Sequence, residues 1–104
     1  MKLEDVGNPS SFDPSTARTV LKPEGEGSDA NDVKDPYIIS VGRKLHMFYT
    51  GWDGAGERPH LAISSNGENW EKIPENPILS REGWHDCLTR VSCVFPQENG
   101  FTMI

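Results

Sequence analysis

The segment of residues 33–52 constrains the fold of this chain more than any other part of the sequence. It holds two runs rich in β-branched and aromatic residues, separated by the polar connection Val-Gly-Arg-Lys at 41–44. Glycine supplies the positive φ that a tight turn requires, so this pattern predicts a β-hairpin. The first run begins at Asp35-Pro36. Because proline cannot donate to a ladder, Pro36 belongs at a strand start or on an edge strand.

The composition favours turns and short strands over long helices. The 104 residues include ten glycines and eight prolines, and only 35% of them are hydrophobic. Apolar residues nowhere recur at the spacing of an amphipathic helix. We therefore expect an all-β chain of antiparallel strands. Its core should be modest, because a domain of about 100 residues buries roughly two-thirds of its unfolded surface.

The charge and the apolar runs of the sequence limit its partners. The formal net charge is −6 at pH 7, with no cluster of Lys and Arg. Nucleic acid binding depends on clustered cations, so the sequence does not indicate DNA or RNA as a partner. No apolar run approaches the ~20 residues of a membrane-spanning helix. Residues 1–10 lack a signal-peptide core, and we expect a cytoplasmic protein if Met1 is the true start.

The side chains that bind metals or form disulfides follow no recognisable pattern. If the chain between Cys87 and Cys93 is extended, these cysteines lie too far apart for a disulfide, and reduced thiols are expected. The three histidines lack metal-ligand spacing. Asp29, Asp32 and Asp35 lack the glycine and terminal glutamate of an EF-hand loop. We therefore predict neither a metal nor another cofactor.

Turn signals divide the rest of the chain into short strand candidates. Residues 1–17 form a turn-rich N-terminal segment, and strands are expected at 18–21, 58–65, 70–73, 88–95 and 100–104. Asn66-Gly67 predicts a type I′ turn. A weak internal repeat sets Asp29 and Asp35 against Asp86 and Ser92. Repeats of about 40–50 residues with four strands each are typical of propeller blades.

Four motifs carry a resemblance to a known family. They are Val-Lys-Asp-Pro-Tyr at 33–37, Met-Phe-Tyr-Thr-Gly at 47–51, Leu-Ala-Ile-Ser-Ser-Asn-Gly-Glu-Asn-Trp at 61–70 and Asn-Pro-Ile-Leu at 76–79. In this order they resemble the five-bladed β-propeller glycoside hydrolases of families 43, 32, 62, 68 and 130, which include arabinanases, levansucrases and invertases. The resemblance covers residues 18–104 and implies antiparallel propeller blades, about two of them, in an incomplete propeller.

The resemblance also implies an active site. In these enzymes a funnel at the propeller axis holds three carboxylates from successive blades. Asp35 matches one of them and would act as base, nucleophile or pKa-tuning group, whereas the equivalent position of the second copy is Ser92. Glycoside cleavage needs a proton donor and a second carboxyl group. An aspartate that merely begins a strand is the alternative interpretation of Asp35.

Five further residues are candidates for contact with a sugar: Asp86, Arg90, Trp52, Trp84 and Asp13. Asp86 and Arg90 precede the inner strand of the second copy, where they would line the same funnel, and a guanidinium can donate to sugar hydroxyls or to the catalytic carboxylate. The indoles of Trp52 and Trp84 would stack on sugar faces. The alternatives are a solvated pair for Asp86 and Arg90, packing for the tryptophans, and a turn role for Asp13.

Residues 64–70 resemble a second motif, the Asp-box of sialidase propellers, with Asn66 where aspartate is usual. Such a box is a folding device in which a polar side chain caps the hairpin turn and the tryptophan packs beneath it. We therefore assign Trp70 to the core.

Two functions from different classes follow. The first is a carbohydrate-active propeller fragment whose parent cleaves the glycosidic bonds of an oligosaccharide or polysaccharide with paired axial carboxylates. The second is a non-catalytic propeller-like module that binds a glycan or a protein. Isolated blades leave sheet edges unpaired, so a homo-oligomer through these edges is expected if the chain is stable alone.

Overall fold

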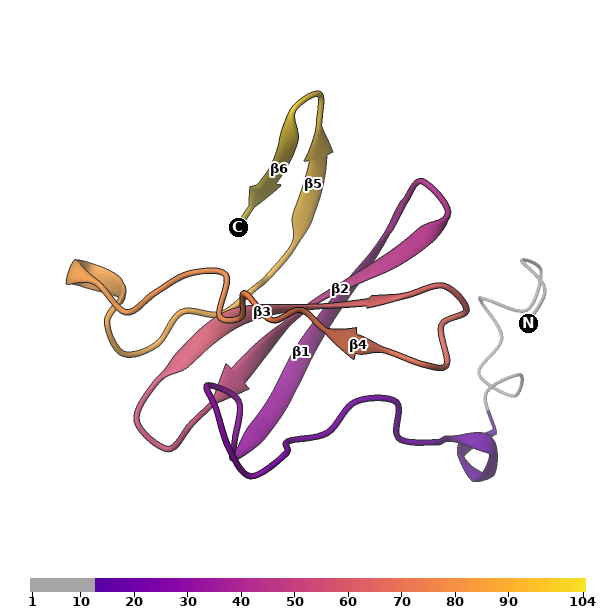
Figure 1. The fold of residues 1–104 in the computed structure, drawn as a ribbon, viewed down its shortest axis with the longest axis horizontal. Coiled ribbons are helices and arrows are strands. Elements are labelled where there is room, and N and C mark those ends of the chain that lie inside the picture. The colour runs from indigo at the N-terminus through magenta and orange to yellow at the C-terminus, as the bar shows by residue number, and fades with distance from the viewer. Residues whose placement is uncertain (1–12) are drawn as a thin grey trace.

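A four-stranded antiparallel sheet forms the centre of the structure (Figure 1). Its strands are β1 (Asp32–Val41), β2 (Lys44–Trp52), β3 (Glu57–Ser64) and β4 (Glu71–Lys72). The order β1-β2-β3-β4 is that of a meander, in which each strand pairs with the next along the chain. The structure is a computed structural model that describes residues 13–104, so most of the expected segment 1–17 lies outside the described residues.

The predicted hairpin is confirmed as the pair β1 and β2. Val41 pairs with Lys44 across the turn, and Gly42 adopts a φ of 61° there. Pro36 lies within β1, at an irregularity in the register between Lys34 and Tyr37. Because β1 is an edge strand, Pro36 stands where a missing N–H donor is tolerated, as the sequence predicts.

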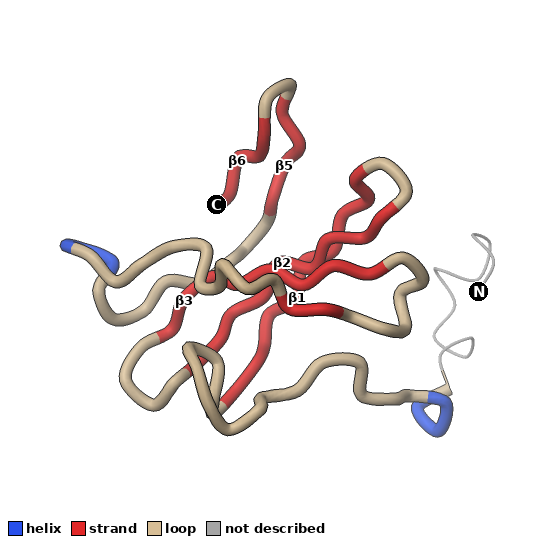
Figure 2. Tube along the Cα trace, in the orientation of Figure 1, coloured by secondary structure: helices blue, strands red, loops and turns tan. Residues whose placement is uncertain are grey.

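A second, two-stranded antiparallel sheet follows the first. It consists of β5 (Val94–Gln97) and β6 (Gly100–Met103). The only helices in residues 13–104 are two short 3₁₀ turns, η3 (Pro14–Thr16) and η4 (Gly83–His85), the second of which lies in the long loop between β4 and β5 (Figure 2). No helix of this part of the chain is long and apolar enough to span a membrane. The expected all-β, antiparallel class is confirmed.

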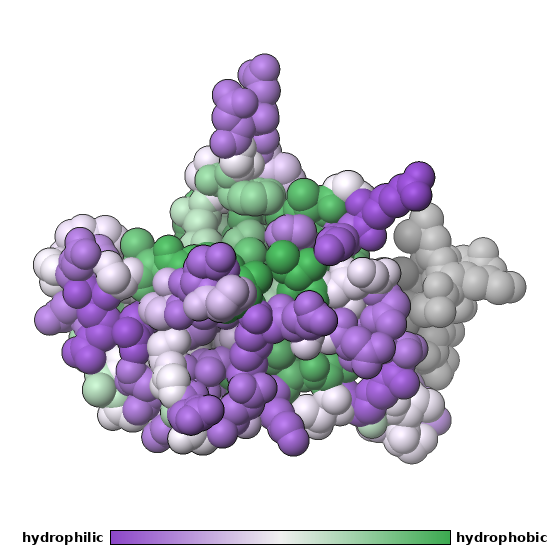
Figure 3. Space-filling model, in the orientation of Figure 1, coloured by the Kyte–Doolittle hydropathy of each residue, from purple (hydrophilic) through white to green (hydrophobic). Residues whose placement is uncertain are grey.

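The two sheets pack against each other around a small hydrophobic core. Phe48, Val91 and Val94 are buried at its centre, and Phe48 lies edge-on to Phe101 with a ring separation of 5.8 Å. Partly buried neighbours complete the core: Tyr37, Ile39, Leu61, Ile78 and Met103. Figure 3 shows hydrophobic residues gathered below the hydrophilic tip of the β5–β6 hairpin. Tyr37 and Ile39 of β1 and Phe48 of β2 point to the same face of the first sheet, and the second sheet covers this face.

The segment of residues 18–21 lies on the opposite face of the first sheet. Val20 and Leu21 line a cavity of about 270 Å³ together with Ile38, Met47 and Tyr49. The strand expected at residues 18–21 is wrong, because this segment has no strand partner in the described structure. Its apolar side chains reach the sheet face while its backbone pairs with neither edge strand.

The strand expected at residues 88–95 is also wrong over most of its length. Only Val94 and the residues after it enter β5. The preceding backbone is bound to the start of β3 instead, where Glu57 donates its N–H to the carbonyl of Cys87 at 2.8 Å and accepts from Thr89 at 3.0 Å. Cys87 and Cys93 are free thiols, as expected.

The connection from β3 to β4 spans residues 65–70 and is not the two-residue turn that Asn66-Gly67 predicts. Ser64 Oγ accepts from the N–H groups of Asn66 and Gly67, and Asn66 Oδ1 accepts from those of Glu68 and Asn69. The polar capping of an Asp-box is therefore present. Trp70 is only half-buried and donates its indole N–H to the Gly67 carbonyl, so its assignment to the core is wrong.

Candidate functional site

Charged side chains from distant parts of the chain meet at one end of the first sheet. Glu57 begins β3, and its side chain is only 5% exposed. Lys34 of β1 and Arg90 of the segment before β5 both form ion pairs with its carboxylate. Arg90 approaches both oxygens, through Nε to Oε2 and through Nη2 to Oε1 at 3.4 Å. We call Lys34, Glu57 and Arg90, together with the neighbouring Asp35, the charged cluster.

The charged cluster keeps Glu57 ionised. The hydrogen bonds from Lys34 and then from Arg90 lower the pKa of Glu57, and they outweigh burial, which acts in the opposite direction. Arg90 responds reciprocally, because Glu57, and to a smaller extent the charge of Asp35, raise the pKa of its guanidinium. Glu57 is therefore a fixed negative charge that holds Arg90 in place, and it is unsuited to donate a proton.

Asp35 has an unusual backbone. Its φ is 53°, and it is the only residue other than glycine with a positive φ among residues 13–104. Asp35 is exposed and lies at the register irregularity of β1, directly before Pro36. Aspartate tolerates the left-handed region better than most residues, yet holding it there costs of order 1–3 kcal/mol. Bulges of this kind turn a side chain out of the regular ladder and are frequent beside functional sites.

Among the predicted site residues, the structure brings Arg90 and Trp52 to the same end of the sheet as Asp35. Trp52 ends β2, pairs with Glu57 in the register and is half-buried. Arg90 forms its ion pair with Glu57, so the alternative of a solvated pair between Arg90 and Asp86 is wrong. Arg90 and Trp52 thus both adjoin Glu57, and Asp35 directly follows Lys34, the other ion-pair partner of Glu57.

Trp84 and Asp86 lie in the loop between β4 and β5. Trp84 is 94% exposed in η4, edge-on to His85. It borders a cavity of about 630 Å³ that Arg90 also lines, with aliphatic walls from the loop and from the end of β6. Asp86 is exposed, and its backbone carbonyl accepts from Arg81. Trp84 therefore borders the charged cluster through Arg90, whereas the Asp86 carboxylate is not part of the cluster.

Asp13 serves the N-terminal turn of the described chain. It caps η3 by accepting hydrogen bonds from the Ser15 N–H at 2.9 Å and from the Ser15 hydroxyl at 2.7 Å. These hydrogen bonds lower the pKa of Asp13. The turn role is therefore the one that the structure shows for this residue.

A second group of polar residues is buried on the opposite face of the sheet. Tyr49 donates its hydroxyl proton to Asp29 Oδ2 at 2.8 Å, and Lys72 Nζ donates to the same oxygen at 2.8 Å. His60 stacks on Tyr49 and bonds to Ser28 Oγ through Nε2 at 2.7 Å. We call Ser28, Asp29, Tyr49, His60 and Lys72 the buried polar clamp. It fastens the glycine-rich loop before β1 to β2, β3 and β4.

The protonation states of the buried polar clamp follow from its contacts. His60 Nδ1 lies 2.7 Å from the carbonyl of Arg58, which only accepts, so Nδ1 carries the proton and Nε2 accepts from Ser28. Burial raises the pKa of Tyr49, and the hydrogen bond to Asp29 adds to this rise. Gly51 has no space for a side chain, since a Cβ there would lie 2.5 Å from Asp29 Cβ. The clamp is therefore tightly packed against Gly51.

Acidification is expected to destabilise the protein through His60. Burial lowers the pKa of His60 below its ordinary value of 6.5, so the native state binds fewer protons than the unfolded chain. This contribution to stability is present above pH 6.5 and is lost as pH falls below it. Urea unfolding at about pH 7.5 and about pH 5.5 measures the difference. His46, whose pKa is also lowered by burial, adds to the loss in the same direction.

The variant His60→Gln should reduce the pH dependence of the free energy of unfolding. His85→Gln, in the 3₁₀ turn η4 outside the buried polar clamp, is the control and should retain it. An unchanged pH dependence in His60→Gln would contradict the assignment of this loss to the buried polar clamp.

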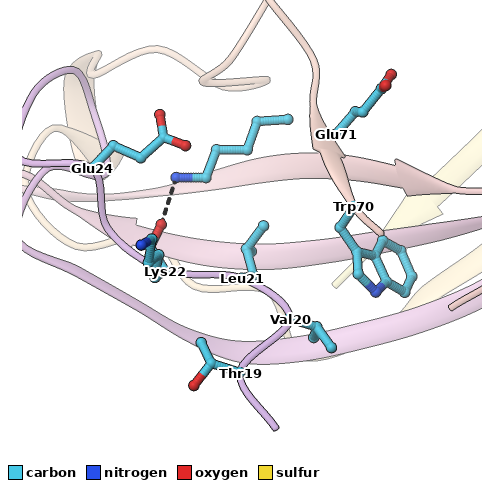
Figure 4. A pocket seen from close by; sticks show the side chains of 8 residues that line it. Thr19, Val20, Leu21, Lys22, Glu24, Trp70 and Glu71 are labelled. Atoms are coloured by element: carbon cyan, nitrogen blue, oxygen red, sulfur yellow. Dashed lines mark hydrogen bonds between the residues drawn. The ribbon is translucent and has the colours of Figure 1, made fainter. Parts of the chain in front are cut away.

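A further cavity of about 670 Å³ lies between residues 19–24 and β4. Figure 4 shows Trp70 and Glu71 on one side of it and Leu21, Lys22 and Glu24 on the other. Lys72, which also lines it, is already bound to Asp29 and to the carbonyl of Lys22 at 2.9 Å. The ammonium group of Lys72 is already bound within the protein, so it is not available to a ligand in this cavity. We therefore place the candidate functional site at the charged cluster.

Sequence reasoning missed Lys34 and Glu57. The only signal for Glu57 was its position directly after a glycine-rich loop, at the start of a strand candidate. Lys34 precedes Asp35 and carried no separate signal. In residues 13–104 no group of three His, Cys, Asp or Glu side chains is arranged to hold a metal ion.

The fold and the site together define an antiparallel β protein with a buried carboxylate that anchors two cations at the end of a four-stranded sheet. Comparison with protein-family models, with curated proteins and with solved structures finds no match for this chain. Its function must therefore be inferred from the geometry of its own residues.

Proposed function

We propose that this chain forms blades of a β-propeller of the glycoside hydrolase type and that its charged cluster binds a sugar. The connectivity supports this proposal. A four-strand meander leads through a long loop to a second sheet, and the hairpin that forms this sheet packs on one face of the meander. Neighbouring blades of a propeller are four-stranded sheets packed in this manner.

The corresponding positions of the two hairpins support the same proposal. Asp35 stands two residues before Tyr37, and Ser92 stands two residues before Val94. Tyr37 and Val94 both contribute to the hydrophobic core between the two sheets. The internal repeat thus relates two residues near the starts of two antiparallel hairpins, Asp35 within β1 and Ser92 just before β5.

The observation that carries the proposal is that Glu57 holds both Arg90 and Lys34, the residue directly before Asp35. Asp35 is exposed on a strained bulge at the same end of the sheet. Arg90 is held by the buried Glu57 while its side chain remains 56% exposed. A carboxylate that accepts and a fixed guanidinium that donates, at the same end of one sheet, are suited to the hydroxyl groups of a sugar.

One observation favours a second function, glycan binding without cleavage. Cleavage requires a carboxylic acid that donates a proton to the leaving group, in addition to a base or nucleophile. Within the charged cluster, Glu57 is ionised and both of its oxygens carry cations. The cluster thus contains a candidate base or nucleophile, Asp35, but no carboxylic acid that could donate a proton. Such a set of residues suits binding of a sugar without cleavage.

Substituting Asp35→Asn should weaken sugar binding roughly tenfold or more, since hydrogen bonds to charged groups contribute about 1.5–3 kcal/mol. Isothermal titration calorimetry with arabino- and fructo-oligosaccharides measures this loss, and a reducing-sugar assay on the same samples measures cleavage. Asp86→Asn is the matched control, because Asp86 is exposed and lies outside the cluster.

Cleavage by the unmodified chain that disappears in Asp35→Asn would support the glycosidase. Binding without cleavage would support the glycan-binding module. Equal affinity of the unmodified chain and Asp35→Asn would contradict both.

A further inference from the structure

Within the buried polar clamp, Ser28 and His60 form a pair that the charged cluster does not use. Ser28 Oγ lies 2.7 Å from His60 Nε2. His60 Nδ1 donates its proton to the Arg58 carbonyl at 2.7 Å, so Nε2 is unprotonated and accepts the hydroxyl proton of Ser28. A hydroxyl that donates to a neutral imidazole, whose other nitrogen is held by an acceptor, has the geometry of an activated nucleophile and its base.

The surroundings of His60 hold its ring in one place and in one protonation state. His60 is buried and stacks on Tyr49 with a ring separation of 5.2 Å. Burial lowers the pKa of His60, so the neutral ring is its main form at pH 7. A general base must be within hydrogen-bond reach of the proton that it takes and must be unprotonated at the working pH. His60 meets both conditions toward Ser28.

Ser28 lies at the surface, whereas His60 does not. Ser28 is partly exposed and directly follows Gly27 in the loop before β1. A Cβ added at Gly25 or at Gly27 would meet no atom within 4 Å, so the space beside these two glycines is open. The serine hydroxyl therefore lies between a buried base and a stretch of backbone that no side chain covers.

We propose that Ser28 is a nucleophile that His60 activates and that it takes the acyl group of a carboxylic ester. Ser28 Oγ attacks the carbonyl carbon of the ester, and its proton passes to His60 Nε2. A bond forms between Oγ and this carbon, and the bond from the carbon to the alcohol oxygen breaks. The alcohol leaves with the proton from Nε2, so His60 becomes neutral again and Ser28 carries the acyl group. This inference is independent of sugar binding at the charged cluster.

Acetylation of the full chain by p-nitrophenyl acetate tests the proposal, with peptide mapping by mass spectrometry to locate each acetyl group. Ser28 should be acetylated roughly a hundredfold faster than Ser80, which is the lower end of general base catalysis. Ser80 is the internal control, because it is exposed and its hydroxyl donates to the Glu82 carboxylate at 2.8 Å instead of to an imidazole. Ser28→Ala should remove the fast phase of p-nitrophenolate release.

Two variants of the buried polar clamp separate the base from the packing around it. His60→Gln should lower the acetylation rate of Ser28 to that of Ser80, because a glutamine side chain cannot take the proton. Tyr49→Phe is the matched control, since it removes a hydroxyl from the clamp and keeps the ring that stacks on His60. It should retain fast acetylation. Far-UV circular dichroism checks the fold of both variants.

Equal acetylation rates of Ser28 and Ser80 in the unmodified chain would overturn the proposal, and this comparison holds even if His60→Gln does not fold. Fast acetylation of Ser28 in folded His60→Gln would also overturn it. Loss of fast acetylation in both His60→Gln and Tyr49→Phe would do the same, because it would assign the reactivity of Ser28 to the packing of the clamp and not to the base.

Discussion

Replacing Phe48 by alanine is expected to lower the free energy of unfolding by about 3–5 kcal/mol. Phe48 is 3% exposed and lies at the centre of the core between the two sheets, in edge-on contact with Phe101. The loss combines the transfer of a buried ring to water with the cavity that remains. Since small domains are stable by only about 5–15 kcal/mol, much of the population would unfold at low urea concentrations. Urea titration followed by tryptophan fluorescence measures the shift.

Phe95→Ala is the matched control for this substitution. Phe95 lies in β5 but is 46% exposed, on the side of the hairpin away from Phe48. Its removal should cost less than about 1 kcal/mol, because the ring loses little buried surface. Equal losses for the two variants would show that the interface between the sheets does not form the main core.

Replacing Asp29 by alanine is expected to destabilise the protein by about 2–4 kcal/mol. The carboxylate accepts from the Tyr49 hydroxyl and from Lys72, both at 2.8 Å. Tyr49 is 1% exposed, so its hydroxyl would remain buried without an acceptor. The loop before β1 would also lose its attachment to β2 and β4. Thermal and urea unfolding both report this change.

A double-mutant cycle separates the hydrogen bond from the rest of the effect. In the background Tyr49→Phe the hydroxyl is absent, so Asp29→Ala should cost less than it does in the unmodified chain. Asp86→Ala, at an exposed position, should change stability by less than about 0.5 kcal/mol. Additive losses for Asp29→Ala and Tyr49→Phe would contradict a direct coupling of the two side chains.

The parts of the fold that the sequence predicted correctly are those with local causes. The hairpin of β1 and β2 follows from strand-forming runs around Gly42, whose positive φ the turn requires. The strand predicted at residues 18–21 is wrong, and the reason is also physical. Apolar residues such as Val20 and Leu21 predict burial, but they do not tell whether the backbone pairs with a strand or crosses a sheet face.

The candidate site was predicted only in part, because its contacts join distant segments. The resemblance to propeller enzymes placed Asp35 and Arg90 along one funnel, and the structure joins Arg90 to Glu57, which also binds Lys34, the neighbour of Asp35 in the chain. Glu57 was missed because its partners depend on the register of β3 and on the path of the loop before β5. Neither is encoded in the residues next to Glu57, so a local pattern cannot reveal a carboxylate of this kind.

The meander order of the first sheet also bears on how the chain folds. Each of its strands pairs with its neighbour in sequence, so the loops closed at each step are short and the entropic cost is low. The second sheet can pack on Phe48 only after the long segment between β4 and β5 has become ordered. The meander can therefore act as a nucleus on which the later hairpin condenses, and the apolar face that receives Val91 and Val94 stays open to solvent until that step.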